Sequence, residues 1–123
     1  MSDSILRDKS KTFAKEIVLL CRKMRQTGVE SALRNQLLRS GTSVGANIHE
    51  AQYAQGTKDF ISKFEIALKE CNESEYWLEL LFQVESITKE EFETYQNECI
   101  ELRRMLVSSV TTLKRKQNEK LML

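Results

Sequence analysis

The sequence predicts an all-α protein that folds as an antiparallel up-down-up-down four-helix bundle. The 123-residue chain contains no proline and only 4 glycines, so few positions can interrupt a regular element. Apolar residues recur at steps of three and four, which aligns their side chains on one face of a helix. The four stretches with this spacing have similar lengths and short connections, which favours antiparallel neighbours. We therefore expect a single domain that spans residues 1–123.

The first helix is predicted over residues 4–26. Lysine and arginine residues occupy mainly the faces away from its apolar stripe. Thr27 and Gly28 end the helix, because glycine readily adopts the left-handed conformation that follows a helix C-terminus. The stripe includes one serine and is formed by Leu6, Ser10, Phe13, Ile17, Leu20 and Met24.

The second helix is predicted over residues 30–53. Gly41 and Gly45 lie inside it, where each glycine costs about 1 kcal/mol relative to alanine. They stand one turn apart among small residues, which indicates a surface that another helix backbone approaches closely, within the bundle or between subunits. Ser43 and Asn47 could form hydrogen bonds across this contact. The residues assigned to the surface are Ser40, Gly41, Ser43, Gly45 and Asn47.

The third helix is predicted over residues 58–85, with Thr57 as its N-cap. Its stripe is formed by Phe60, Phe64, Ala67, Cys71, Ser74, Leu78 and Leu81. The aromatic pair Tyr76 and Trp77 lies beside this stripe. Such a pair suits either a subunit interface or a wide core, and the sequence leaves both open.

The fourth helix is predicted over residues 89–116. Thr88 is followed three residues later by Glu91, a capping-box pattern in which each side chain bonds the backbone N–H of the other residue. The remaining residues, 117–123, are expected to fray. The stripe is formed by Phe92, Tyr95, Cys99, Leu102, Leu106, Ser109 and Leu113.

Motifs that would indicate catalysis or metal binding are incomplete. His49 is the only histidine, and Tyr53 stands where a zinc HExxH helix has its second histidine. The run Ser40–Asn47 looks like a phosphate loop but has no lysine after Gly45. The carboxylates of the last two helices include no Glu-x-x-His pair of the di-iron type, and they form a solvated or subunit-facing surface. We therefore expect no enzymatic activity, no metal and no cofactor.

Cysteine usage and hydropathy indicate a cytoplasmic protein without a membrane span. Cys21, Cys71 and Cys99 form no Cys-x-x-Cys motif and fall on apolar stripes, as expected of buried thiols in a reducing compartment. The longest apolar run, Ile17–Cys21, is far shorter than the roughly 20 residues that a membrane span needs. The N-terminal residues show no secretory signal.

The formal net charge of +1 conceals an uneven distribution along the chain. Residues 1–39 carry 9 Lys/Arg and 4 Asp/Glu, a net of +5. Residues 40–102 carry 4 and 13, a net of −9, and residues 103–123 carry 6 and 1, a net of +5. Local basic clusters attract phosphate groups, although the same residues could be solvated or could pair with the acidic middle.

The candidate nucleic-acid-binding residues fall into two groups at the ends of the predicted bundle. The first and fourth helices are neighbours and the termini meet at one end, which would hold Lys9, Lys11, Lys114, Arg115 and Lys116. The opposite end would hold Arg22, Lys23, Arg25 and Arg34, with Arg39 further along the second helix. Because no base-reading motif is present, we expect weak sequence preference.

One run in the second helix is unusually specific: Arg-Ser-Gly-Thr-Ser-Val-Gly-Ala-Asn-Ile over residues 39–48. It is accompanied by Phe13–Val18, Leu37-Leu38, Glu50-Ala51, Asp59–Lys63, Ile66–Glu70 and Tyr76–Leu81. Together these runs closely resemble the four-helix-bundle proteins known as 23S rRNA intervening-sequence proteins. The resemblance is strong over about residues 10–82 and mainly periodic over 83–118.

The resemblance implies a compact bundle that assembles into a ring-shaped homopentamer and has no known enzymatic activity. Some members of the family are encoded inside insertions in large-subunit rRNA genes. A related branch is the accessory variability protein of diversity-generating retroelements. It is a basic pentamer that partners a reverse transcriptase and binds nucleic acid.

Two hypotheses about function follow. In the first, the chain is a non-enzymatic oligomer that binds RNA or an RNA–protein complex through basic patches at its ends. In the second, it is a purely structural or assembly module that forms a homo-oligomeric ring with a protein partner. The acidic surface of the last two helices would then meet the basic surface of the first two helices of a neighbour, a head-to-tail contact that can close a ring.

Overall fold

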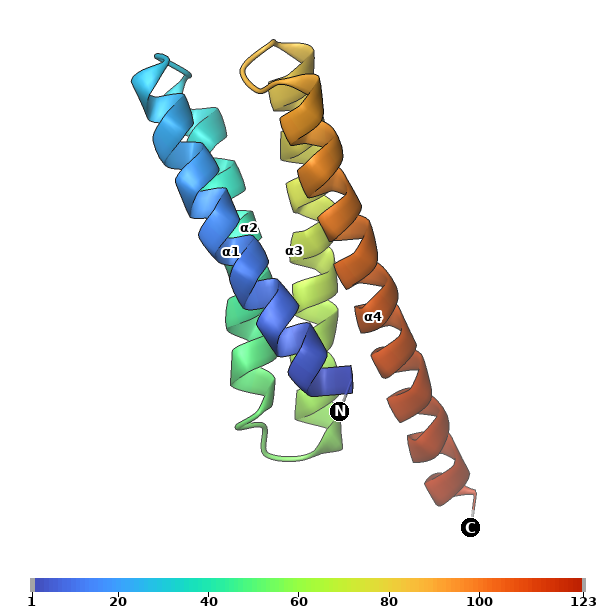
Figure 1. Cartoon of the computed structure of the whole chain (residues 1–123). Helices are drawn as coiled ribbons and strands as arrows, with labels where there is room; N and C mark the ends of the chain where they lie inside the picture. The colour runs from blue at the N-terminus through green and yellow to red at the C-terminus, as the bar shows by residue number, and fades with distance from the viewer. Residues whose placement is uncertain (1, 123) are drawn as a thin grey trace.

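The computed structural model describes residues 2–122, and Figure 1 shows their four helices running alternately up and down. The helices are α1 (Ser2–Gln26), α2 (Ser31–Ala51), α3 (Thr57–Gln83) and α4 (Lys89–Leu121). No strand occurs within the described residues. Each helix packs against the next one in the chain, and α4 also contacts α1. The predicted all-α, up-down-up-down four-helix bundle is therefore confirmed.

The connection after α1 uses the predicted glycine stop. Gly28 has a φ of 77°, in the left-handed region, and the N–H of Val29 donates to the carbonyl oxygen of Met24 at 3.4 Å. This bond satisfies one of the carbonyl groups that the last turn of a helix leaves without a partner. The stop at Gly28 is therefore confirmed.

The predicted capping box at the start of α4 is also confirmed. The N–H of Glu91 donates to Thr88 Oγ1 at 3.0 Å, and the N–H of Thr88 donates to Glu91 Oε1 at 2.9 Å. Two N–H groups that have no partner inside the helix are thereby satisfied. By contrast, Thr57 does not cap α3: it is the first helical residue, and Gly56 precedes it at a φ of 144° without a side-chain hydrogen bond.

The C-terminal boundary of α4 is the largest departure from the predicted elements. The helix continues to Leu121 instead of ending near residue 116. Once packing fixes the earlier turns, each further residue adds a backbone hydrogen bond without the cost of nucleating a new helix. An i,i+4 ion pair between Arg115 and Glu119, at 3.9 Å, supports the same turns. The other boundaries are within two residues of the prediction, with α2 ending at Ala51 and α3 at Gln83.

The core is one apolar column to which all four helices contribute. Phe13 of α1, Leu37 of α2, Phe64 of α3 and Leu106 of α4 are completely buried within it. Burial of such a side chain contributes about 1.5–3 kcal/mol, so the column is the main source of stability. Among the described residues, none of the helices combines the length and apolar character needed to cross a membrane.

The last helix lies against α3 along much of its length but meets α1 only over a short region. Figure 1 shows α4 diverging from α3 toward its C-terminal end, which lies beyond the start of α1 and beyond the α2–α3 connection. The burial pattern agrees, since Val110 is the last buried residue of α4 and Leu113 is only half-buried. The C-terminal turns of α4 are therefore only partly packed against the rest of the bundle.

Candidate nucleic-acid interface

The small-residue surface of α2 packs against α1. A Cβ atom placed on Gly45 would lie 3.2 Å from the carbonyl oxygen of Ser10, and one on Gly41 would lie 2.9 Å from Ile17 Cγ2. Side chains larger than hydrogen would push the two helices apart, which explains why these two positions are glycine. The sequence left open whether this surface packs within the bundle or between subunits. Gly41 and Gly45 provide a close approach within the bundle, between α1 and α2.

The polar members of this surface do not bond across it, contrary to the prediction. Ser43 Oγ donates to the carbonyl oxygen of Arg39 at 2.7 Å, and Asn47 Nδ2 donates to the carbonyl oxygen of Ser43 at 2.9 Å. Both bonds run back along α2, because the carbonyl one turn earlier is the nearest acceptor for a short polar side chain in a helix. These two residues therefore support α2 locally.

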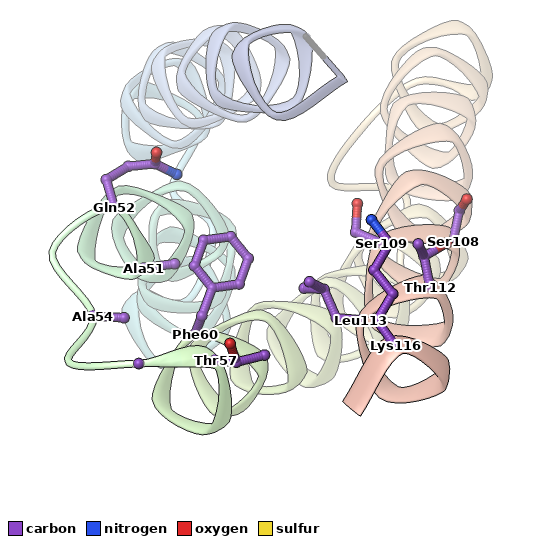
Figure 2. Close-up of a pocket in the computed structure, with 11 residues that line it drawn as sticks. Ala51, Gln52, Ala54, Thr57, Phe60, Ser108, Ser109, Thr112, Leu113 and Lys116 are labelled. Atoms are coloured by element: carbon purple, nitrogen blue, oxygen red, sulfur yellow. The ribbon is translucent and has the colours of Figure 1, made fainter. Parts of the chain in front are cut away.

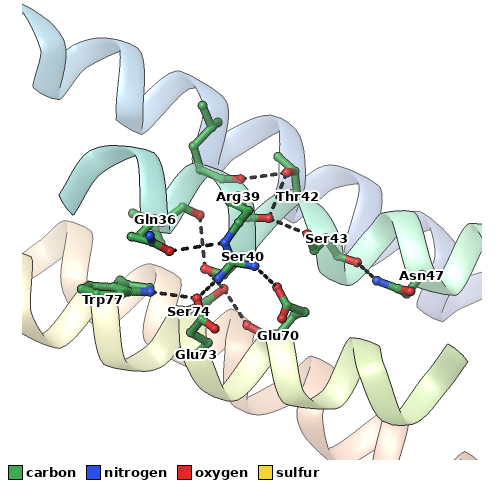
Figure 3. Close-up of polar contacts among 12 residues, drawn as sticks. Gln36, Arg39, Ser40, Thr42, Ser43, Asn47, Glu70, Glu73, Ser74 and Trp77 are labelled. Carbon is green, nitrogen blue, oxygen red and sulfur yellow. Dashed lines mark hydrogen bonds and ion pairs between the residues drawn. The ribbon is translucent and has the colours of Figure 1, made fainter. Parts of the chain in front are cut away.

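Ser40 faces the opposite neighbour and belongs to a polar seam between α2 and α3, which Figure 3 shows. Its Oγ atom lies 2.9 Å from Ser74 Oγ, and Ser74 Oγ lies 2.9 Å from the carbonyl oxygen of Glu70. Both hydroxyl groups are completely buried. Because a buried polar group without a partner is costly, the two serines fix how α2 and α3 align along their axes.

Arg39 of α2 lies on the solvent-facing side of the same polar seam and pairs with two carboxylates of α3. Its Nη1 atom lies 2.7 Å from Glu70 Oε2, and its Nη2 atom pairs with Glu73. Glu70 is only 9% exposed, so the guanidinium group compensates a nearly buried charge. Figure 3 shows Trp77 joining this group, with Nε1 donating to Glu73 Oε2 at 3.1 Å. Arg39 was predicted to bind nucleic acid, but here it joins two helices.

The two rings of the aromatic pair differ in burial. Trp77 is half-buried and packs against the core. Tyr76 is 59% exposed, with its ring edge-on to that of Trp77 at a centroid distance of 4.9 Å. The core explanation therefore accounts for Trp77, and Tyr76 remains on the surface.

The end of the bundle near Gly28 holds the predicted group of four cations. Lys23 Nζ lies 2.8 Å from Glu91 Oε2, and this hydrogen bond and negative charge raise the pKa of Lys23. Arg34 donates through Nη1 to the carbonyl oxygen of Val29 at 2.9 Å. Arg22 and Arg25 are exposed and form no ion pair with another described residue.

At the other end, the predicted cations do not form one cluster. Lys9 Nζ lies 2.5 Å from Glu101 Oε1 of α4, whereas Lys114 Nζ lies 2.8 Å from Glu65 Oε2 of α3. Figure 1 shows why: α4 continues well past the start of α1, so the start of α1 and the end of α4 do not meet. Lys11 and Lys116 are exposed and form no ion pair with another described residue.

A cleft of about 640 Å³ lies where α4 leans away, between α4 and the α2–α3 connection. Figure 2 shows Phe60 and Leu113 extending toward one another across it, with Lys116 on the α4 side. The sequence contains no signal for this cleft, because it depends on the angle at which α4 leaves the bundle.

Two carboxyl groups face each other where α4 meets α1. Burial of Glu98, together with the negative charges of Glu16 and Glu101, raises the pKa of the Glu98 carboxyl to about 7. Lys9 opposes this shift. No group of three His, Cys, Asp or Glu side chains in the described part of the chain is arranged to hold a metal ion.

The cysteines are buried free thiols, as predicted. Cys71 Sγ donates to the carbonyl oxygen of Cys99 at 3.2 Å. Burial raises the pKa of Cys21 to about 11, against the opposing charge of Arg34. A thiol with such a pKa remains protonated at neutral pH, so Cys21 is a poor nucleophile and a poor metal ligand.

Comparison with known proteins agrees with the resemblance seen in the sequence. A family model described as 23S rRNA-intervening sequence protein matches residues 2–108. A crystal structure from Bacteroides thetaiotaomicron, described as a protein with unknown function from the S23 ribosomal protein family, is 48% identical to this chain. The match covers 90% of this chain and 99% of that one, with a TM-score of 0.88. A search of curated proteins finds no significant match.

Proposed function

This chain belongs to the family of 23S rRNA-intervening sequence proteins, and from that membership we propose that it is a non-enzymatic, oligomeric RNA-binding protein. It would bind RNA alone or within an RNA–protein complex such as one with a reverse transcriptase. We take the oligomer to be a homopentameric ring and the compartment to be the cytoplasm. The observation that carries the proposal is the division of the basic residues into paired and unpaired sets.

The paired set is held by acidic residues of α3 and α4. Its members are Lys9, Lys23, Arg39, Lys89, Arg103, Lys114 and Arg115. These cations are less available to a ligand, since binding it would cost an existing ion pair. The unpaired predicted cations are Arg22 and Arg25 at one end and Lys11 and Lys116 at the other.

Arg22 and Arg25 are the strongest phosphate-binding pair of this set. They stand three residues apart in the last turns of α1, so their side chains leave the helix on the same face. Both are exposed, and a guanidinium group matches a phosphate with two parallel hydrogen bonds. A ring of subunits would repeat the pair around its axis, and each neutralised phosphate would release counterions.

The same ion pairs argue against the second hypothesis, in which acidic α3 and α4 meet the basic surface of a neighbour. Glu65, Glu70, Glu73, Glu75 and Glu91 are already engaged by cations of their own chain. A neighbour would have to compete with these contacts. We therefore favour RNA binding over a purely structural module.

The test is fluorescence anisotropy with a labelled RNA of mixed single-stranded and hairpin structure at about 50 and 300 mM salt. We expect binding at low salt that weakens strongly at high salt, because phosphate contacts dominate. Arg22→Ala/Arg25→Ala should weaken binding about tenfold or more. The matched control, Lys58→Ala/Lys69→Ala, removes the same charge from exposed sites on α3 and should change binding less than about twofold.

Two results would overturn the proposal. One is no RNA binding by the unaltered protein even at low salt. The other is an equal loss of binding in the arginine variant, the lysine control and every other variant of an unpaired cation. Light scattering tests the assembly: we expect about five times the 14.3 kDa chain mass, and a monomer at every concentration would contradict the ring.

A further inference from the structure

A groove of about 490 Å³ runs between the first half of α1 and the second half of α2. Arg7 and Lys11 line it from α1, one helical turn apart, and His49 lines it from α2. Neither Arg7 nor His49 was among the residues predicted from the sequence to bind a ligand. Their position together depends on how α1 and α2 align, which only the packed structure shows.

The groove follows from the backbone contact between Ser10 and Gly45. Because Gly45 allows the two helices to approach closely, the floor between them is formed by small side chains, including Ala14 and Ala46. Within the described part of the chain, the space above this floor is open as part of the groove. A phosphate group can therefore come close to both helices while the longer side chains surround it.

The charge of the groove favours an anion. Arg7 and Lys11 supply two positive charges, and His49 supplies a hydrogen-bond donor in either of its protonation states. Among the described side chains that line the groove, Asp8 is the one carboxylate. Arg7 Nη2 donates to Ser4 Oγ at 3.1 Å, a neutral partner that holds the guanidinium group without cancelling its charge.

An exposed aromatic ring stands at the α2 end of the groove. Tyr53 is 76% exposed, and its ring centroid lies 5.6 Å from that of His49. An aromatic face beside a positively charged groove is the arrangement that proteins use for unpaired nucleotides, since the backbone follows the cations and a base stacks on the ring. The bases of a duplex are stacked on one another and are not available in this way.

We propose that this groove binds single-stranded RNA, with Arg7, Lys11 and His49 contacting the phosphate backbone and Tyr53 stacking on a base. The inference rests on the proposed function, because it names a site at which RNA binding occurs. It adds a substrate class, unpaired RNA, and a stacking residue. The residues of the groove lie far from Arg22 and Arg25, which are at the other end of the bundle, so the two sites can be tested separately.

The test uses a labelled single-stranded oligouridylate and a duplex RNA of equal length, each titrated with the full chain at low salt. We expect the single strand to bind more tightly than the duplex. Arg7→Ala/Lys11→Ala should weaken single-strand binding about tenfold or more. Tyr53→Ala should weaken it about five- to tenfold, the loss of one stacked base, and Tyr53→Phe should retain most of the affinity.

Two matched controls accompany these variants. Tyr76→Ala removes another exposed tyrosine, and Lys58→Ala/Lys69→Ala removes two exposed charges from α3. Both should bind within about twofold of the unaltered protein. Photocrosslinking of 4-thiouridine RNA to the unaltered protein provides a readout that needs no variant: we expect the crosslinked peptide to contain Tyr53.

The outcomes separate this inference from the proposed function. If the unaltered protein binds no RNA, both are wrong. If RNA binds but the groove variants behave like their controls, while Arg22→Ala/Arg25→Ala loses binding, the groove is wrong and the proposed function stands. Equal affinity for single-stranded and duplex RNA, or crosslinks confined to other peptides, would also overturn the groove.

Discussion

The side chains of Glu98 on α4 and Glu16 on α1 bring two carboxyl groups together across the least extensive contact between neighbouring helices in the bundle. Negative charges on both carboxylates would repel each other, and the partial burial of Glu98 adds to the free-energy cost of ionising it. The junction is therefore most favourable when Glu98 carries a proton.

This junction makes stability depend on pH. The pKa of Glu98 is raised from 4.5 to about 7 on folding, so the folded state binds more protons than the unfolded state between these values. The free energy of unfolding should therefore fall as pH rises from about 4.5 to about 7, and remain lower above that. Because solvent screens a carboxyl that is partly exposed, we expect a loss on the order of 1 kcal/mol.

Glu98→Gln should remove most of this dependence, since glutamine cannot ionise. Urea denaturation should show the variant about 1 kcal/mol more stable than the unaltered protein at pH 8, with little difference at pH 5. Glu93→Gln, an exposed position on the same helix, serves as the control and should have little effect at either pH. An equal gain from Glu98→Gln at both pH values would contradict the prediction.

Gly45→Val should destabilise the fold by forcing α1 away from α2. Its Cβ would meet the carbonyl oxygen of Ser10 at 3.2 Å, and a backbone atom cannot move aside as a flexible side chain can. We expect a loss of about 2 kcal/mol, typical of an overpacked contact. Ala46→Val is the control, because it adds a β-branched residue at an exposed position of the same helix. Equal thermal melting of the two variants would show that the close approach is unimportant.

Arg39→Met should cost about 2 kcal/mol, because it leaves the nearly buried Glu70 without its cation. The double variant Arg39→Met/Glu70→Gln should recover at least half of this loss, since no buried charge then remains. Lys9→Met breaks a more exposed pair with Glu101 and should cost less than about 1 kcal/mol. Chemical denaturation measures all three, and a double variant no more stable than Arg39→Met would refute this account.

The three thiols should resist modification in the folded protein. Cys21 is buried with a pKa of about 11, and the side chains of Cys71 and Cys99 are completely buried, so a reagent in solution cannot reach them in the folded state. An Ellman assay should count close to zero thiols in buffer and three in guanidinium chloride. Rapid reaction of one thiol before unfolding would contradict the buried assignment.

The helices could be predicted from sequence because apolar spacing and end signals agree locally. Gly28 and the pair Thr88 and Glu91 each determine a boundary through residues within a few positions of each other. The last turns of α4 carry neither signal. Residues 117–121 have no apolar periodicity, and their helix is an extension of turns that packing has already ordered.

The candidate site was harder to predict because its contacts join distant positions. The partner of Arg39 lies 31 residues away at Glu70, and that of Lys23 lies 68 residues away at Glu91. Net charge per segment cannot distinguish a paired cation from an unpaired one. The α1–α2 groove was missed for the same reason, since it depends on the alignment that Gly45 fixes.

The overhang of α4 also has a mechanical consequence. At about 1.5 Å per residue, its 33 residues make a rod roughly 50 Å long. The N-terminal end of this rod is fixed by the capping box and by the Lys23–Glu91 ion pair, whereas the residues after Val110 are not buried. A rotation of about 10° at the capped end would carry the far tip through roughly 9 Å. A small change in the angle of α4 at its capped end would therefore move a ligand or neighbouring subunit bound at the tip by nearly the diameter of a helix.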